Sequence, residues 1–280
     1  MSRGGDAARQ RIQQLDALCS QVRAVVHDAA SCVQQVRATS LETTHKDDRS
    51  PVTRADREAD ALLRSRLTAL YPAAWLSEET ADSPARLAAA SVWIVDPLDG
   101  TKEFIAGLPE YCVAVALVED AVPVLGVVHN PATDEVFWAV RGGGAFLNGQ
   151  PVFVREGNRM LASRSEIPRG EFEPFAGRWD IVPTGSIQYK LGLIAAGRAA
   201  ATLSRGPKHE WDVCAGALIV EEAGGRASEL LGTPLAYNQP FPKVKGILAA
   251  APHAYSRALT EVETVGAADR MDEFKSQLGS

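Results

Sequence analysis

The sequence lacks any cluster of cysteines or histidines of the kind that binds zinc. The four cysteines lie far apart, at positions 19, 32, 112 and 214, and form no CxxC pair. The five histidines are also scattered and show no HxxxH or HxH spacing. Because zinc sites and disulfide frameworks need closely spaced ligands or paired cysteines, we expect buried, reduced thiols and structural or surface histidines.

Basic runs are absent too, and the chain has a formal net charge of −6 at pH 7. Nucleic-acid-binding surfaces need clustered Lys and Arg, so we predict no nucleic-acid polymer as a partner. The longest apolar runs, such as Val113–Val118, are far shorter than the roughly 20 residues that span a bilayer. The charged, amide-rich N-terminus has no apolar segment of the signal-peptide kind. We therefore predict a soluble, cytoplasmic chain with no transmembrane segment.

What the chain does contain is an ordinary share of apolar residues, 46% of 280, in periodic patterns. Three- and four-residue steps of Ile, Leu and Val predict an amphipathic helix over residues 6–37. Residues 42–52 are polar and predict a loop. Thr53 follows, with Asp56 three residues further on, a pattern close to a capping box that begins a second helix.

Short Val- and Trp-rich runs predict the strands of a sheet, at residues 92–95, 111–118, 122–129 and 135–140. Since these runs are apolar at nearly every position, we expect both faces of the sheet to be covered. Asn148-Gly149 predicts a tight hairpin. Arg141–Gly144 resembles a phosphate loop only superficially, because it lacks the Gly-Lys-Ser/Thr ending, and it predicts a hairpin connection.

After about residue 163 the pattern becomes one of alternating helices and strands, with helices at 186–196 and 212–223 and strands at 199–203 and 246–250. The fold prediction is an α/β (α+β) layered sandwich. Residues 1–160 would form an antiparallel sheet with helices, and residues 161–280 a smaller α/β half. No repeat or Gly/Ser linker marks a boundary, so the junction near residue 160 is placed only by this change of pattern.

The most informative stretch for chemistry is Trp93 to Phe104, WIVDPLDGTKEF. A buried strand would end at Asp96, and Thr101 would cap a short helix that begins at Lys102. Paired carboxylates at a strand end suit a hard divalent cation, and the amides of Gly100 and Thr101 suit a phosphate. The alternative is that Asp96 and Asp99 only make a turn and cap a helix.

Three further carboxylates each have a structural alternative. Glu78 follows Trp75-Leu76, which can form a parallel neighbouring strand, but Glu78 can equally be a surface residue. Asp212 precedes an apolar helix and is an obvious N-cap. Asp56 near a helix start is also explained by the helix dipole. None of the three identifies a site by itself.

Together, four motifs in order resemble the inositol monophosphatase superfamily of lithium-sensitive, magnesium-dependent phosphatases. The resemblance covers nearly the whole chain from the first helix to about Pro252. Its motifs are SPVTRAD at 50–56, SEE at 77–79, WIVDPLDGT at 93–101, and WDVCAG at 211–216 with EAGG at 222–225.

The resemblance implies a set of metal ligands and a way of activating water. One Mg²⁺ would be bound by Glu78, Asp96 and the carbonyl of Leu98, and a second by Asp96, Asp99 and Asp212; the family uses two or three ions, and inhibition by Li⁺ and Ca²⁺ is expected. Thr101 and Asp56 would orient and deprotonate the water. The amides of Gly100 and Thr101 would hold the transferred phosphate.

Within the superfamily, the run DPLDGTKEFI at 96–105 most resembles the 3'(2'),5'-bisphosphate nucleotidases. Ser163, Ser186 and Lys190 would be substrate contacts together with Asp212, with Lys190 on the second phosphate. A solvated helix lysine is the alternative for Lys190, and an N-cap role for Ser186 is compatible with ligand binding. The chain departs from the usual pattern at Glu166, where those enzymes have His.

The predicted function is hydrolysis of adenosine 3',5'-bisphosphate to AMP and phosphate, a small-metabolite reaction connected with sulfate assimilation or sulfotransfer. The nearest alternative is an inositol monophosphatase, or another sugar- or histidinol-phosphate phosphatase, with the same metal site. A non-catalytic metabolite-binding protein on this fold is a third. The sequence leaves the oligomeric state open.

Overall fold

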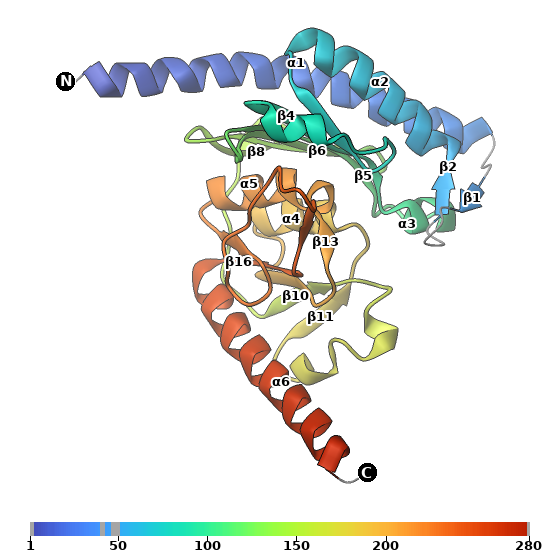
Figure 1. The fold of residues 1–280 in the computed structure, drawn as a ribbon, viewed down its shortest axis with the longest axis vertical. Helices are drawn as coiled ribbons and strands as arrows, with labels where there is room; N and C mark the ends of the chain where they lie inside the picture. Colours follow the sequence, from blue (N-terminus) through green and yellow to red (C-terminus); the bar gives the residue numbers. More distant parts are fainter. Residues whose placement is uncertain (1–2, 40–42, 46–50, 279–280) are drawn as a thin grey trace.

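The architecture is a stack of alternating helical and sheet layers, shown in Figure 1. This computed structural model describes residues 3–39, 43–45 and 51–278. Helices α1 (Arg3–Thr39) and α2 (Arg54–Leu70) cover one face of the first sheet, and α4 (Ile187–Ala195) and α5 (Cys214–Glu222) cover the other. A second sheet lies beyond α4 and α5, and α6 (Pro252–Leu278) packs on its far side. The layered α/β fold predicted from the sequence is confirmed.

The first sheet has seven strands in the order β3-β4-β5-β6-β7-β8-β9. Their bounds are Ala74–Ser77, Ser91–Asp99, Cys112–Glu119, Val122–Asn130, Glu135–Val140, Gly144–Leu147 and Gln150–Pro151. All neighbours pair antiparallel except β3 and β4, which are parallel. The predicted hairpin at Asn148-Gly149 joins β8 to β9, and Arg141–Gly144 connects β7 to β8 as predicted.

The second sheet is mixed and has five strands in the order β11-β10-β12-β16-β14. Their bounds are Asp180–Pro183, Arg159–Ala162, Ala201–Ser204, Ile247–Ala250 and Arg226–Ser228. Strand β10 runs parallel to β11 and β12, so the segments that follow β10 and β12 leave the sheet at the same end. A small ribbon pairs β13 (Lys208–His209) with β15 (Lys243–Val244).

Strand β5 shows why the first sheet has helices on both faces. Side chains alternate along a strand, and both sets are apolar here. Cys112, Ala114, Ala116 and Val118 join the core beneath α4 and α5, while Val113, Val115 and Leu117 join the core beneath α1 and α2. A near-continuous apolar run therefore became a strand buried on both faces, as the sequence predicted.

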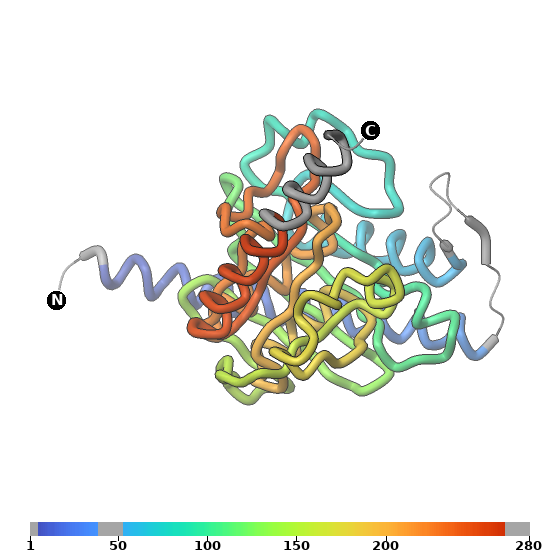
Figure 2. The backbone as a smooth tube through the Cα atoms, turned by 90° about the horizontal axis from the view of Figure 1, so that it is seen from below, coloured from blue at the N-terminus to red at the C-terminus, as the bar shows by residue number. Residues whose placement is uncertain are grey.

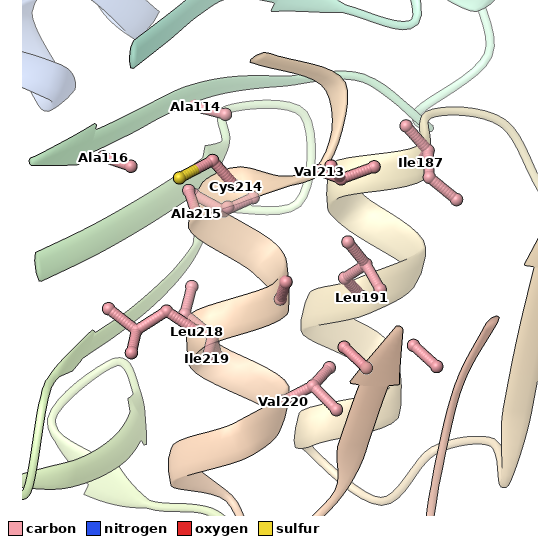
Figure 3. Packing of buried hydrophobic residues seen from close by; sticks show 14 of the residues in the cluster. Ala114, Ala116, Ile187, Leu191, Val213, Cys214, Ala215, Leu218, Ile219 and Val220 are labelled. Carbon is pink, nitrogen blue, oxygen red and sulfur yellow. The ribbon is translucent and has the colours of Figure 1, made fainter. Parts of the chain in front are cut away.

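Small side chains let α5 lie close to both the sheet and α4. Figure 3 shows Ala114 and Ala116 of β5 next to Cys214 and Ala215 of α5. A Cβ on Gly216 would lie 2.6 Å from the Cβ of Leu191 in α4, a distance that real Cβ atoms do not reach. Close packing of this kind makes the position of α5, and of the residues just before it, rigid.

Several local predictions are sharpened or corrected. Thr53 is the N-cap of α2 and forms a capping box with Asp56, as predicted. The stretch expected to be a loop, 42–52, contains parts of two short antiparallel strands, β1 (Thr43–His45) and β2 (Pro51–Thr53), while 46–50 lies outside the described residues. The four cysteines are free, with all but Cys32 buried.

The sequence analysis made no prediction for α6. Its apolar positions 254, 255, 258 and 262 recur at helical spacing and pack on the second sheet, so the signal was present. Figure 2 gives the view from below, in which the first part of α1 extends past the rest of the chain. The described residues include no helix with the length and apolarity that a membrane crossing requires.

Candidate active site

The parallel pairing of β3 and β4 brings two predicted ligands to the same edge of the first sheet. Ser77 is opposite Val95 in the register, and the backbone N–H of Glu78 donates to the carbonyl of Val95 at 3.3 Å. Glu78 and Asp96 are therefore the next residues on neighbouring strands. The interpretation of Trp75-Leu76 as part of a parallel strand is confirmed, and Glu78 is half-buried and not a free surface residue.

The chain then turns sharply between Asp96 and Asp99, where the β4–β5 pairing becomes irregular. Gly100 follows in the left-handed region, with φ 91°, and a Cβ there would lie 2.7 Å from the carbonyl oxygen of Glu110. Only glycine fits without strain. Gly100 is the N-cap of α3 (Thr101–Ala106), so the prediction that Thr101 caps a helix starting at Lys102 was wrong by one residue.

Thr101 is not the N-cap of α3, and its hydroxyl instead contacts Asp56 and Leu98. Its Oγ1 lies 3.1 Å from Oδ1 of Asp56 and 3.0 Å from the carbonyl oxygen of Leu98. The other oxygen of Asp56, Oδ2, accepts the backbone N–H of Thr53 at 2.7 Å and its hydroxyl at 2.6 Å. Asp56 thus serves the helix cap with one oxygen and faces Thr101 with the other.

Asp99 connects the end of β4 to the start of α4. Its Oδ2 accepts hydrogen bonds from the Ser186 hydroxyl at 2.7 Å and from the backbone N–H of Gln188 at 2.6 Å. Ser186 is the N-cap of α4, where its hydroxyl also accepts the N–H of Tyr189 at 3.0 Å. The predicted capping role of Ser186 is confirmed, and the same hydroxyl fixes the orientation of Asp99.

Asp212 reaches the site from the segment before α5, but not as the predicted N-cap. It ends the short 3-10 turn Glu210–Asp212, and the N-cap of α5 is Val213. The Asp212 Oδ2 accepts the backbone N–H of His209 at 2.7 Å. Because the carboxylate bonds back to its own turn instead of to α5, the helix start gives no reason for an acid at this position.

The carboxylates in this region destabilise one another when ionised. Asp96 is 1% exposed, and its pKa is raised well above its ordinary value, first by burial and then by the charges of Glu78, Asp99 and Asp212. The pKa of Asp212 is raised to about 7 by burial, Glu78 and Asp99. Burial also raises the pKa of Asp99. Such a cluster needs either protons or cations.

The donor set fits Mg²⁺ chemically, because hard divalent cations prefer carboxylate and carbonyl oxygens. In the part of the chain that the structure describes, no three Asp, Glu, His or Cys side chains are grouped closely enough to hold a metal ion as they stand. Two of the four carboxylates are engaged elsewhere, Asp99 with α4 and Asp212 with its own turn. The Leu98 carbonyl lies within hydrogen-bond distance of the Thr101 hydroxyl.

A cavity of about 160 Å³ adjoins these acids and is lined by all the predicted substrate residues except Thr101. Its lining comprises Asp99, Gly100, Glu103, Ser163, Ser165, Glu166, Ser186, Ile187, Lys190, Lys208 and Asp212. Lys190 is 2% exposed, and burial lowers its pKa to about 8. The alternative that Lys190 is a solvated helix lysine is therefore wrong.

Sequence reasoning missed two groups in this cavity, Lys208 and Glu103. The Lys208 ammonium lies 3.1 Å from Oε1 of Glu166, the residue at which the chain departs from the resembling enzymes. Lys208 lies four residues before Asp212 in the sequence, so its position was a usable signal. Lys102, by contrast, is exposed.

Comparison with known proteins places this chain among phosphatases of one family. The model of the inositol monophosphatase family matches residues 12–267. An inositol-1-monophosphatase of Rhizobium meliloti is 35% identical over 210 residues, 69% of this chain and 77% of that protein. A histidinol-phosphatase of Chlorobaculum parvum is 37% identical over 200 residues, 66% of this chain and 75% of that protein.

Among solved structures, CysQ from Bacteroides thetaiotaomicron, described as a bacterial member of the same family, superposes with a TM-score of 0.69 at 27% identity. The match covers 84% of this chain and 96% of CysQ. The shared fold therefore extends over most of both chains.

Proposed function

The chain belongs to the inositol monophosphatase family, and on that premise we propose that it hydrolyses adenosine 3',5'-bisphosphate to AMP and phosphate. The family is generally magnesium-dependent. We assign Glu78, Asp96, Asp99 and Asp212, with the Leu98 carbonyl, as the residues that would hold the ions. When bound, Mg²⁺ would lower the pKa of the attacking water and screen the charge of the phosphate.

The residues of the chain would then move the proton and hold the phosphate. Thr101 Oγ1 accepts a proton from the water and passes its own to Asp56 Oδ1, 3.1 Å away. Burial raises the pKa of Asp56 and makes it a better proton acceptor. The water oxygen bonds to phosphorus, the ester P–O bond breaks, and the leaving oxygen takes a proton from solvent, to which Asp56 afterwards releases the proton that it received. The amides of Gly100 and Thr101 bind the phosphate oxygens.

One observation carries the choice of a bisphosphate, namely the buried Lys190 in the same cavity as Asp99 and Asp212. A lysine ammonium is costly to bury without an anionic partner. The charges of Glu166, Asp99 and Glu103 offset part of this cost, and a second phosphate on the substrate would add a direct anionic partner, with Ser163 and Ser186 as further contacts. The likeness to CysQ, and the resemblance of residues 96–105 to bisphosphate nucleotidases, support this choice.

Inositol 1-phosphate is a second candidate, favoured by the relatives whose names include that activity. The two are separated by measuring phosphate release with Mg²⁺ from a panel of adenosine 3',5'-bisphosphate, inositol 1-phosphate, histidinol phosphate and sugar phosphates. A higher kcat/KM for inositol 1-phosphate than for the bisphosphate would overturn the nucleotidase proposal.

The alternative that this protein binds a metabolite without catalysing a reaction is tested with the variant Asp99→Asn. If phosphate release under saturating Mg²⁺ is unchanged by this substitution, the proposed metal site is wrong. A steep fall in phosphate release, in a variant that circular dichroism shows to be folded, supports the proposed metal site.

A further inference from the structure

Glu166 has an unusual environment for a carboxylate that lines a cavity. It is 2% exposed and closes a tight turn that begins at Ser163, in which its backbone N–H donates to the carbonyl of Ser163 at 3.0 Å. The turn leaves the second sheet directly after β10, at the end where β12 also terminates. Parallel pairing of these two strands therefore brings Glu166 to Ser204, 38 residues later in the chain.

The two oxygens of the Glu166 carboxylate differ in their hydrogen bonds. Oε1 accepts the Ser204 hydroxyl at 2.5 Å and the Lys208 ammonium at 3.1 Å. Oε2 is buried and has no hydrogen-bond partner among the residues that the structure describes. Native proteins rarely leave a buried acceptor unpaired, because it has lost water and gained nothing in return. The unpaired Oε2 indicates that a group outside the chain, a water or a bound ligand, donates to it.

The chemistry of that donor follows from the charges nearby. Burial alone would raise the pKa of Glu166, but the charge of Lys208 and the hydrogen bond from Ser204 lower it below the ordinary value. The group is thus an ionised carboxylate, which can only accept hydrogen bonds. Its negative charge is already balanced by Lys208, and Lys190 lines the same cavity. A neutral donor, a hydroxyl, suits this environment better than a second ammonium.

We propose that Glu166 is a specificity-determining residue whose Oε2 accepts a hydrogen bond from a hydroxyl of the substrate. The site then selects phosphate esters of a polyol or ribose that keep a free hydroxyl. The proposal rests on the proposed function, because it takes this cavity as the substrate site. It assigns a role to Glu166 at the position where the resembling nucleotidases have His.

A purely structural role, in which Glu166 only positions Lys208, makes a different prediction. Such a role would affect all anionic substrates alike and would be indifferent to the presence of a hydroxyl. The useful measurement is therefore a ratio, kcat/KM for a hydroxyl substrate divided by kcat/KM for the matching deoxy compound. Two pairs distinguish the source of the hydroxyl: adenosine 3',5'-bisphosphate with its 2'-deoxy form, and inositol 1-phosphate with its monodeoxy forms.

In the wild-type protein we expect a ratio of about 10 to 100 for at least one pair, the range of a hydrogen bond to a charged group. Glu166→Ala should bring that ratio close to 1. Glu173→Gln is the matched control, since Glu173 is an exposed acid of the same segment, and it should keep the wild-type ratio.

Glu166→Gln gives a second, shape-preserving test. Because Ser204 and Lys208 both donate to Oε1, the amide oxygen should take that position and place its NH₂ where Oε2 was. Replacing the substrate hydroxyl by fluorine, which only accepts, should then harm Glu166→Gln less than the wild type. An equal loss in both proteins would overturn the proposal.

The wild-type ratio decides the matter even if the variants do not fold. A ratio close to 1 for every pair, with phosphate still released, overturns the role of Glu166 and leaves the phosphatase intact. If no compound of the panel releases phosphate, the proposed function fails. The role of Glu166 is then tested by calorimetry, from the ratio of the Kd values of the deoxy compound and the hydroxyl compound. Tighter binding of an amino analogue than of the hydroxyl compound would overturn the assignment to a neutral donor.

Discussion

Burial and neighbouring acids raise the pKa of Asp96 and Asp212 in one group of side chains, whereas opposite charges offset one another in a second group that lines the adjoining cavity. We call the first group, Glu78, Asp96, Asp99 and Asp212, the acidic wall. The second group, Glu166, Lys190 and Lys208, is the mixed wall. Asp96 in the acidic wall is destabilised by three neighbouring acids, but Glu166 in the mixed wall has a lysine at 3.1 Å and a pKa below its ordinary value.

The difference separates the two tasks of a phosphatase site. Repelling carboxylates are incomplete without cations, so the acidic wall is suited to collecting metal ions. The mixed wall has its charges in place already and is suited to selecting the rest of the substrate. Substitutions in the acidic wall should therefore affect every substrate, and substitutions in the mixed wall should affect some substrates more than others.

The largest effect should come from Asp96→Asn. Loss of a carboxylate that we assign to both ions should lower kcat by at least about 10³-fold for all substrates, since metal ions supply several kcal/mol of transition-state stabilisation. The same change removes a repelled buried charge, so Tm in EDTA should rise. Phosphate release and thermal unfolding measure the two effects, with Asp16→Asn on the exposed face of α1 as the control. A fall in both kcat and Tm would contradict the statement that Asp96 is a repelled charge in the absence of metal ions.

The next effect concerns the proton path beside the acidic wall. Thr101→Val removes the hydroxyl that faces Asp56 Oδ1, and kcat should fall by about 10² to 10⁴-fold, the usual contribution of general base catalysis. The response of the rate to Mg²⁺ concentration should barely change, because Thr101 contributes no carboxylate. Thr101→Ser keeps the hydroxyl and should retain most of the activity. Equal losses in the two variants would show that the methyl group, and not the proton path, matters.

The pH dependence of protein stability tests the repulsion within the acidic wall without any substrate. The pKa of Asp212 is raised from 3.8 to about 7, so the folded state binds more protons than the unfolded state between those values. Stability from this group is then complete at low pH and is lost as pH rises towards 7. In EDTA, wild type should lose stability over this range relative to Asp212→Asn, by at most a few kcal/mol.

Mg²⁺ provides the internal control for that measurement. Since cations would neutralise the acidic wall, the pH-dependent difference between wild type and Asp212→Asn should shrink or reverse when Mg²⁺ is added. Denaturant unfolding at several pH values, with and without Mg²⁺, gives the four curves. If the stability difference between wild type and Asp212→Asn is the same with and without Mg²⁺, Asp212 is not near a bound ion.

The two walls also differ in how well the sequence predicts them. The acidic wall follows from short-range signals, because Asp96 and Asp99 end a recognisable buried strand and Glu78 follows a second apolar run. One local prediction failed there, since the N-cap is Gly100 in place of Thr101, which depends on a left-handed backbone and the close approach of Glu110. The grouping of Asp212 with these acids was implied only by the family resemblance.

The mixed wall depends on contacts that no local pattern encodes. Glu166 and Lys208 are 42 residues apart and meet because β10 and β12 are parallel neighbours. Both strands have only four residues, and β10 was not predicted at all. Lys190 was identified from its motif, but its burial is a consequence of α4 packing between the two sheets. Such side chains need the tertiary structure before their environment can be described.

The smallest predicted effect tests the selectivity of the mixed wall through Lys190. Lys190→Met should raise KM for adenosine 3',5'-bisphosphate about tenfold and change KM for adenosine 3'-monophosphate, which keeps only the scissile phosphate, much less, since a charge-assisted contact to the second phosphate is lost. Lys102→Met, an exposed lysine of α3, is the matched control. Equal losses on both substrates would remove Lys190 from the second-phosphate site.

The pH dependence of the same KM separates charge from packing. The pKa of Lys190 is lowered to about 8 by burial, so its ammonium is lost in the free protein as pH rises past that value. KM for the bisphosphate should therefore rise above pH 8 in the wild type. Lys190→Arg stays charged over this range, and its KM should be flat there even if it starts higher. A parallel rise in both proteins would assign the pH effect to another group, and Lys190 would then act by filling space between α4 and the second sheet.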